Sequence, residues 1–180
     1  MPAQYDAMIE ATGTALAGLI PLQIIRGQIS LMRANDQSAL IKTNLCYGGY
    51  LGPAIEGVHV LGSTFQHWLD TPEIRSEDHL YVRDRLAEAV SPVFTENDVI
   101  GGRVGFRAST PDRLPVIGLA ASGQAVPTFI SGAHGSHGLV TSIAAAHILA
   151  DMISGAGQSQ PRETLAAVAP SRFGQKQVLR

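Results

Sequence analysis

The segment from residue 126 to residue 153 constrains the fold more than any other part of the chain. Val126 to Ser131 predicts a strand, and the alanine-rich stretch Leu139 to Ile153 predicts a buried helix. The glycines between them let the backbone approach a planar or anionic ligand, and the first helical turn favours negative charge. We therefore predict a ligand-binding turn formed by Gly132, His134, Gly135, Ser136, His137, Gly138 and Leu139.

Arg107 ends an apolar stretch, beginning at Arg103, that predicts a strand. Because side chains alternate along a strand, Arg107 is expected to project to the face opposite Val104 and Phe106. A guanidinium in a pocket on that face can hold a carboxylate through two parallel, charge-assisted hydrogen bonds. Two alternatives stay open: a surface or interdomain salt bridge, and a local ion pair with Asp112, which follows five positions later.

Tyr50 is the second candidate for this carboxylate pocket. It lies between Gly49 and the turn Leu51–Pro53, at the edge of a predicted strand. Opposite Arg107, its hydroxyl could hydrogen-bond the same ligand. A tyrosine in such a place is usually a core or rim residue, and Tyr47 on the same strand is an alternative. The sequence barely separates the two tyrosines.

The length of 180 residues allows one domain with a substantial core, or one domain plus part of a second, which we favour. With 16% charged residues and a net charge of −2, no basic stripe predicts nucleic-acid binding. The single cysteine, Cys46, fits a reducing compartment and is expected to be buried. No run of ~20 apolar residues and no signal-peptide pattern occurs, so we expect a soluble, cytoplasmic protein without a membrane partner. A large RNA would have to be contacted by scattered cations, such as Arg75, Arg83, Arg85, Arg172, Lys176 and Arg180.

Short apolar stretches separated by glycine and proline predict an antiparallel sheet. One helix, capped by Ser76 and carrying Val82, Leu86 and Val90 on one side, is expected to cover a face of this sheet. A short helical turn begins at Glu163, and the tail is expected to end as a mobile basic extension. Strands are expected at Tyr5–Gly13, Leu22–Met32 (bent or bulged at Gly27), Leu40–Tyr47, Gly57–Phe65, Arg103–Arg107 and Val126–Ser131.

Other reactive groups point to no further site. His134 and His137 are spaced as zinc ligands can be, but the glycines around them make the segment a loop, so we expect no metal site. Glu96, Asp98 and Asp112 are expected on solvated turns. The sequence contains no nucleophile elbow, no phosphate loop and no Gly-x-Gly-x-x-Gly fingerprint.

Taken in order, these segments resemble the C-terminal half of the amino-acid-oxidase superfamily of FAD-dependent oxidoreductases. The likeness covers nearly the whole chain. Within the superfamily it is greatest to the oxidase domains of the bifunctional tRNA 5-methylaminomethyl-2-thiouridine biosynthesis proteins, through Arg26–Ser30, Arg107–Pro115, His134–Leu139 and Leu165–Phe173. The segments that resemble the superfamily are Tyr5–Gly13, Ile25–Ser30, Gly49–Pro53, Gly57–Thr64, Gly105–Arg107, Thr110–Gly118 and Gly132–Leu139.

The resemblance implies an α+β fold: an antiparallel or mixed sheet forming a substrate domain with a covering helix, plus the C-terminal strand and helix of an incomplete, Rossmann-like FAD-binding domain. The implied domains are residues 1–21 (end of the FAD-binding domain), 22–110 (substrate domain), 111–155 (return into the FAD-binding domain) and 156–180 (tail). The implied cofactor is FAD, held by Thr12, Gly13 and the glycine loop Gly132–Leu139.

The resemblance also implies a reaction. The implied substrate is carboxymethylaminomethyl-uridine in tRNA, whose modified side chain is an N-substituted glycine. Arg107, assisted by Tyr50, would hold the carboxylate of this side chain. The methylene next to the carboxylate is then oxidised, and the aminomethyl base remains. Two alternatives are an oxidase or dehydrogenase of a small free amino acid, and a β-rich binding domain without catalysis. An N-terminal FAD-binding segment is expected to be missing, through excision or as a natural remnant. We expect the full-length protein to oxidise C–N bonds and this chain alone to be inactive.

Overall fold

A computed structural model describes residues 5–120 and 126–174. The chain forms two compact units: residues 1–24 with 107–180 (unit 1), and residues 25–106 (unit 2). Unit 1 is therefore built from both ends of the sequence, and unit 2 is the stretch between them. Sequence analysis places the corresponding domain boundaries near residues 22 and 110.

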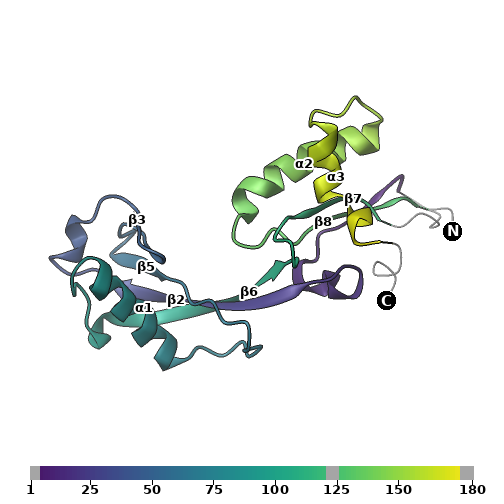
Figure 1. Cartoon of the computed structure of the whole chain (residues 1–180). Coiled ribbons are helices and arrows are strands. Elements are labelled where there is room, and N and C mark those ends of the chain that lie inside the picture. Colours follow the sequence, from purple (N-terminus) through teal and green to yellow (C-terminus); the bar gives the residue numbers. More distant parts are fainter. Residues whose placement is uncertain (1–4, 121–125, 175–180) are drawn as a thin grey trace. The chain divides into compact units, whose positions relative to one another are not determined.

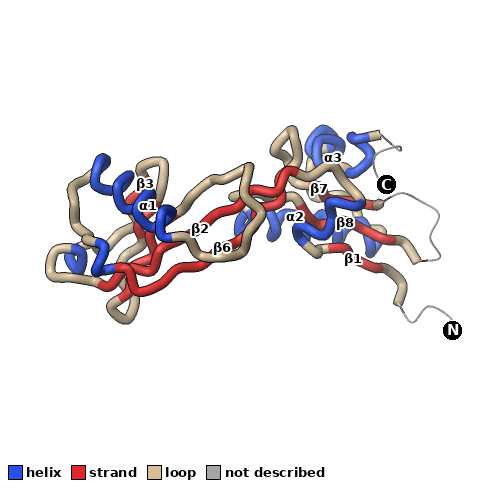
Figure 2. The backbone as a smooth tube through the Cα atoms, turned by 90° about the horizontal axis from the view of Figure 1, so that it is seen from below, coloured by secondary structure: helices blue, strands red, loops and turns tan. Residues whose placement is uncertain are grey.

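Unit 1 contains a three-stranded sheet in the order β1 (Met8–Glu10), β8 (Thr128–Gly132) and β7 (Val116–Leu119). Figure 2 shows these strands side by side. β1 pairs with β8 in parallel, and β7 pairs with β8 in antiparallel fashion. Parallel pairing of β1 with β8 requires the chain to leave the sheet after β1 and to return much later.

Both faces of this sheet are covered. Ile117 and Phe129 pack against helix α2 (Gly138–Ser154) on one face. Their neighbours along the strands, Val116 and Ile130, pack against Leu16 of the 3₁₀ helix η1 (Gly13–Gly18). This alternation follows from the period of two along a strand. In Figure 1, α2 and α3 lie on one side of β7 and β8, and residues 13–18 lie on the other.

The tail is more ordered than the sequence indicates. After α2 the chain forms α3 (Arg162–Val168) and the 3₁₀ helix η4 (Pro170–Phe173). Val168 and Pro170 are buried, and Arg172 pairs with Asp112 at 2.8 Å. The helical turn expected from Glu163 is thus present as α3, and the expected basic end of the tail, Lys176 to Arg180, lies outside the described residues.

Unit 2 contains a five-stranded sheet in the order β3-β4-β5-β2-β6, with antiparallel pairs from β3 to β2. Helix α1 (Ser76–Ala89) covers one face, where its Val82 and Leu86 pack against Leu51 and Leu61. The α+β fold class is confirmed. The strands are β2 (Gln23–Arg33), β3 (Leu45–Cys46), β4 (Tyr50–Leu51), β5 (Val58–Gly62) and β6 (Val99–Ser109); two 3₁₀ turns, η2 (Ser38–Leu40) and η3 (Glu96–Asp98), precede β3 and β6.

Three local predictions differ from the structure. The expected strand at Leu40–Tyr47 is reduced to β3, because Asn35 accepts hydrogen bonds from the backbone N–H groups of residues 37–39 and stabilises a turn instead. Cys46 is exposed rather than buried, since β3 is an edge strand. Helix α1 begins at Ser76 itself, and its N-cap is Arg75.

The expected bulge lies opposite the glycine and not at it. Strand β2 is continuous through Gly27. Ile29 pairs with Gly62, whereas Arg26 pairs with Gln66, so residues 27–28 face residues 63–65. The extra residue therefore belongs to the segment that follows β5.

A buried cation organises unit 2. Arg26 is 0% exposed and forms an ion pair of 2.6 Å with Asp78 in the first turn of α1. The guanidinium also donates to the backbone carbonyls of Thr71 and Glu73. Since buried charges are tolerated only when paired and hydrogen-bonded, this network ties α1 and the loop before it to β2. Its remaining members are the side-chain oxygens of Gln28 and Gln66.

Among the described residues, no helix combines the length and the apolar character that crossing a membrane requires.

Replacing Asp78 by alanine should strongly destabilise the protein, because Arg26 would remain buried without a counter-charge. We expect a loss of about 3–5 kcal/mol in the free energy of unfolding. Asp84→Ala is the matched control, since Asp84 pairs with Arg83 at the surface and should cost less than about 1 kcal/mol. Urea unfolding followed by circular dichroism measures both. If Asp78→Ala lowers the free energy of unfolding no more than Asp84→Ala does, the Arg26–Asp78 pair is dispensable.

The Asp112–Arg172 pair should make stability depend on acidity. Hydrogen bonds from Arg172, with weaker ones from Thr110 and Leu114, hold the pKa of Asp112 well below its usual range. A carboxyl whose folded pKa is depressed stabilises the protein fully above its unfolded pKa of about 4, and that contribution falls as pH decreases. The carboxylate is 38% exposed, so the contribution should stay below about 1 kcal/mol.

The difference in unfolding free energy between wild type and Asp112→Asn should be constant from about pH 5 to 8 and shrink below about pH 4. Arg172→Gln should remove most of this pH dependence. A difference that grows at low pH would contradict the assigned pair.

Candidate functional site

The predicted ligand-binding residues of unit 1 gather at one edge of its sheet. β1 and β8 are parallel, with Met8 opposite Thr128 and Glu10 opposite Ile130, so both strands end on the same side. Thr12 and Gly13 follow β1, and the glycine loop follows β8. In α/β sheets, ligands bind beyond the carboxyl ends of parallel strands. The structure therefore brings together the two predicted halves of this site.

Gly132 lets the loop approach η1 closely. A Cβ atom at this position would lie 2.2 Å from Cδ1 of Leu16, which is itself fully buried. Any larger residue would push η1 away from the sheet. The sequence marks Gly132 as a loop glycine but gives no sign of its partner, which lies far away along the chain.

Two residues of the glycine loop adopt left-handed backbone conformations. Gly135 has a φ of 56°, and Ala133 has a φ of 55° although it carries a side chain. Non-glycine residues rarely adopt such angles, and those that do cluster at ligand sites. Ala133 is buried and was missed by sequence reasoning, because alanine as a residue type carries no signal for this conformation.

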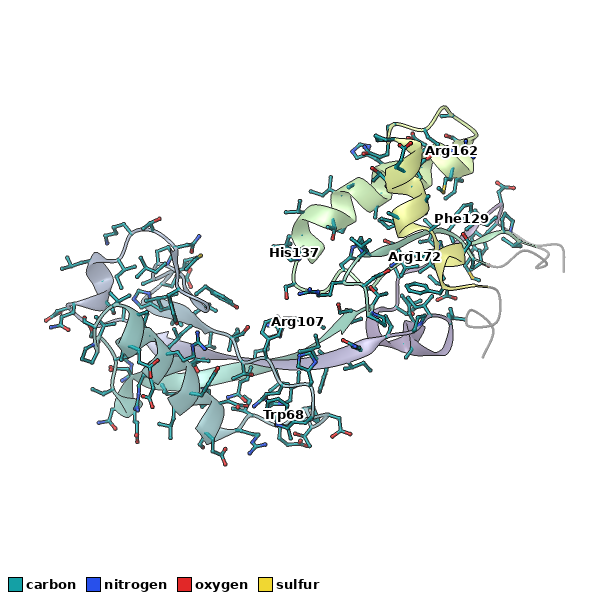
Figure 3. All side chains as sticks on the ribbon, in the orientation of Figure 1. Trp68, Arg107, Phe129, His137, Arg162 and Arg172 are labelled. Atoms are coloured by element: carbon teal, nitrogen blue, oxygen red, sulfur yellow. The ribbon has the colours of Figure 1, made fainter. Side chains whose placement is uncertain are left out.

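Hydrogen bonds attach this loop to the end of β6. The N–H of Gly135 donates to the carbonyl of Ala108 at 2.9 Å, and Ser109 pairs with His134 as an isolated bridge. Arg107 immediately precedes Ala108 in β6 and is half-buried. Arg107, which the sequence predicts to bind a carboxylate, is therefore next in sequence to the residues that bond to the predicted cofactor loop. Figure 3 labels Arg107 on β6 and His137 at the start of α2.

The neutral ring of His134 connects the end of β8 to the first turns of α2 through hydrogen bonds. Its Nδ1 lies 2.8 Å from the hydroxyl of Thr141, which itself donates to the carbonyl of His137. The Thr141 oxygen thus accepts from Nδ1–H, and Nε2 is left to accept from Ser131 at 3.3 Å. Burial lowers the pKa of His134, which favours this neutral form. Among the described residues, no group of three histidine, cysteine or acidic side chains is placed to hold a metal.

The first turn of α2 supplies further hydrogen-bond donors. His137 is the N-cap residue and makes no side-chain capping bond. The N–H groups of Gly138 and Leu139 have no acceptor within the helix, as in any first turn. Ser136 and His137 are exposed, and Leu139 is 92% exposed. Left-handed loop residues, a tight glycine and a helix N-terminus together fit the planar and anionic parts of a dinucleotide cofactor.

The structure separates the two candidate tyrosines. Leu51 packs against the α1 face of the unit 2 sheet, so the preceding Tyr50 projects to the opposite face. There Tyr50 is 40% exposed, and its ring lies against Gly62. Tyr47 instead packs against the core beneath α1. Of the two tyrosines, only Tyr50 lies on the face opposite α1.

Asp112 pairs with Arg172 in unit 1. Its Oδ2 accepts from Nε of Arg172 at 2.8 Å, and its Oδ1 accepts from Nη2 of Arg172 at 3.2 Å, from the hydroxyl of Thr110 and from the N–H of Leu114. The sequence gives no sign of Arg172 as this partner, because the two residues lie 60 positions apart. Arg107 belongs to unit 1 and Tyr50 to unit 2.

The family model described as "FAD dependent oxidoreductase" matches residues 2–152. The chain is 31% identical over 189 residues to the tRNA 5-methylaminomethyl-2-thiouridine biosynthesis bifunctional protein MnmC of Chromobacterium violaceum. This alignment covers 89% of the present chain and 29% of the relative. It is 34% identical over 178 residues to MnmC of Azoarcus sp., covering 90% and 28%. The chain thus spans under a third of the length of these relatives.

Two solved structures share the fold. Iminodiacetate oxidase from Chelativorans sp. BNC1 has a TM-score of 0.73 at 22% identity, covering 94% of this chain and 47% of its own. Glycine oxidase from Geobacillus kaustophilus has a TM-score of 0.72 at 20% identity, covering 92% and 45%. The family match extends over most of the sequence, through the glycine loop and α2. This chain belongs to the FAD-dependent oxidoreductases of the amino-acid-oxidase superfamily.

Proposed function

We propose that this chain forms the substrate domain and part of the FAD-binding domain of an oxidase that cleaves the glycine-like side chain of carboxymethylaminomethyl-uridine in tRNA to the aminomethyl form. The observation that carries this proposal is the attachment of the β6 end, with Arg107, to the glycine loop through the Ser109–His134 bridge. In this proposal Arg107 is the carboxylate-binding residue, and the attached loop is the one that holds the flavin. The MnmC relatives supply the tRNA part of the proposal.

Each residue has a defined task in this proposal. Arg107 binds the substrate carboxylate and thereby orients the adjacent methylene. Tyr50 is the second residue proposed to donate a hydrogen bond to a substrate carboxylate. The loop Gly132–Leu139, with Thr12 and Gly13, holds the cofactor by backbone N–H groups. When bound, FAD accepts the two electrons released as the C–N bond is oxidised; water then cleaves the resulting imine to glyoxylate and the aminomethyl base.

A second candidate is oxidation of a small free amino acid. The two solved structures of similar fold are an iminodiacetate oxidase and a glycine oxidase, whose names denote small carboxylate substrates. Arg107 would bind either kind of substrate through the same carboxylate. Glyoxylate released from modified tRNA, compared with glyoxylate released from free glycine, separates the two candidates.

Flavin binding tests the class of the protein. The chain is to be produced alone and fused to the dinucleotide-binding segment of an FAD-dependent oxidase, because Thr12, Gly13 and the loop provide only part of a flavin site. We expect flavin absorbance near ~450 nm in the purified protein and little or none with the isolated chain. Folded protein without flavin in both cases would favour a non-catalytic β-rich binding domain.

Removing the arginine that is proposed to bind the substrate carboxylate should reduce turnover. Arg107→Ala in the flavin-loaded enzyme should lower kcat/KM for the carboxylate substrate by a factor corresponding to about 2–4 kcal/mol, the cost of losing a buried charge-assisted clamp. Arg103→Ala is the matched control, since it removes the same charge from an exposed position of the same strand. An unchanged kcat/KM in Arg107→Ala would remove Arg107 from the site.

A further inference from the structure

A small pocket lies within unit 2, on the side of Tyr47 rather than Tyr50. Its lining includes Tyr47, Gly48, Tyr81 and Arg85. The hydroxyl of Tyr47 is buried, and among the described residues it has no hydrogen-bond partner. An unsatisfied buried hydroxyl costs about 1–3 kcal/mol, so native proteins rarely retain one without a reason. The enclosed part of the pocket has room for about one oxygen-sized atom.

Arg85 supplies a cation at the mouth of this pocket. It is exposed, donates a long hydrogen bond of 3.4 Å to the hydroxyl of Tyr81, and lies over the ring of Tyr81 at 5.9 Å from its centroid. In the part of the chain that the structure describes, it forms no ion pair. The other described arginines that are candidates for RNA contact differ, since Arg75, Arg83 and Arg172 each pair with a carboxylate.

Gly48 makes room for this cation. Its φ is 90°, which favours glycine, and a Cβ atom there would lie 2.8 Å from Nη2 of Arg85. Burial raises the pKa of Tyr47 to about 12, although the charge of Arg85 opposes the shift. The hydroxyl therefore keeps its proton at neutral pH. The pocket thus offers an O–H donor and guanidinium N–H donors without an acidic group among its lining residues.

We propose that the Tyr47–Arg85 pocket binds a phosphate group, and that this phosphate belongs to the backbone of the RNA substrate. A phosphate oxygen can enter the enclosed part and accept from Tyr47, while Arg85 binds the remaining oxygens at the open mouth. The RNA part of this inference rests on the function proposed above. The phosphate part rests on the unsatisfied hydroxyl and the unpaired cation alone.

Inorganic phosphate tests the pocket independently of RNA. Millimolar phosphate should raise the Tm of the wild-type protein more than an equal ionic strength of chloride, because ligands that bind the folded state stabilise it. Tyr47→Phe and Arg85→Ala should each reduce this increase, and Arg83→Ala should leave it unchanged. If all four proteins respond alike, phosphate acts only as an adventitious ion and the pocket proposal is overturned.

Fluorescein-labelled tRNA tests the RNA part. Arg85→Ala should weaken its binding about tenfold and reduce the salt slope of log K by roughly 1, whereas Arg83→Ala should change the affinity less than about twofold. Tyr47→Phe should weaken it roughly threefold to tenfold. Equal effects of Arg83→Ala and Arg85→Ala would reject the RNA contact.

Turnover of modified tRNA by the flavin-loaded wild-type enzyme, measured alongside, reports on the proposed function separately. Lost tRNA oxidation with intact phosphate stabilisation rejects the tRNA substrate and assigns the pocket to free phosphate. Intact tRNA oxidation without phosphate stabilisation rejects the pocket.

Discussion

The parallel pairing of β1 with β8 is the constraint on which the rest of the structure depends. Parallel neighbours cannot be joined by a tight turn, so the residues between them must form structure of their own before the chain returns. Residues 25–106 do so as a separate unit. The same pairing brings Thr12 and Gly13 to the edge where the loop Gly132–Leu139 begins. One backbone ladder thus determines both the division into units and the position of the candidate cofactor site.

The sequence predicted the elements whose residue pattern is local. The spacing of Val82 and Leu86 predicted α1, and the glycines after residue 131 predicted the loop and α2. What could not be predicted depends on distant partners. Arg26 and Asp78 are 52 residues apart, and only the fold shows that they meet. The φ of Ala133 is likewise imposed by its surroundings and leaves no trace in residue type.

Strand alternation explains why two nearby tyrosines are assigned different tasks. Tyr50 lies on the face of its sheet opposite α1, beside a glycine that leaves space for its ring. Tyr47 lies among apolar residues beneath α1, with its hydroxyl unpaired near Arg85. In the proposed assignments, the first tyrosine contacts the group that reacts and the second contacts a remote part of the same substrate. Binding energy from such remote contacts can be used to position the reacting atoms.

The Arg26 network also bears on how this protein can change during evolution. Arg26 and Gln28 hold the loop before α1 largely through its backbone carbonyls, at Thr71, Glu73 and Arg75. Every residue type carries a carbonyl, so these bonds do not depend on which side chains the loop displays. Trp68, which is 75% exposed, can therefore be exchanged without loosening the loop. Selection can alter the surface chemistry of this loop while its backbone keeps the same course.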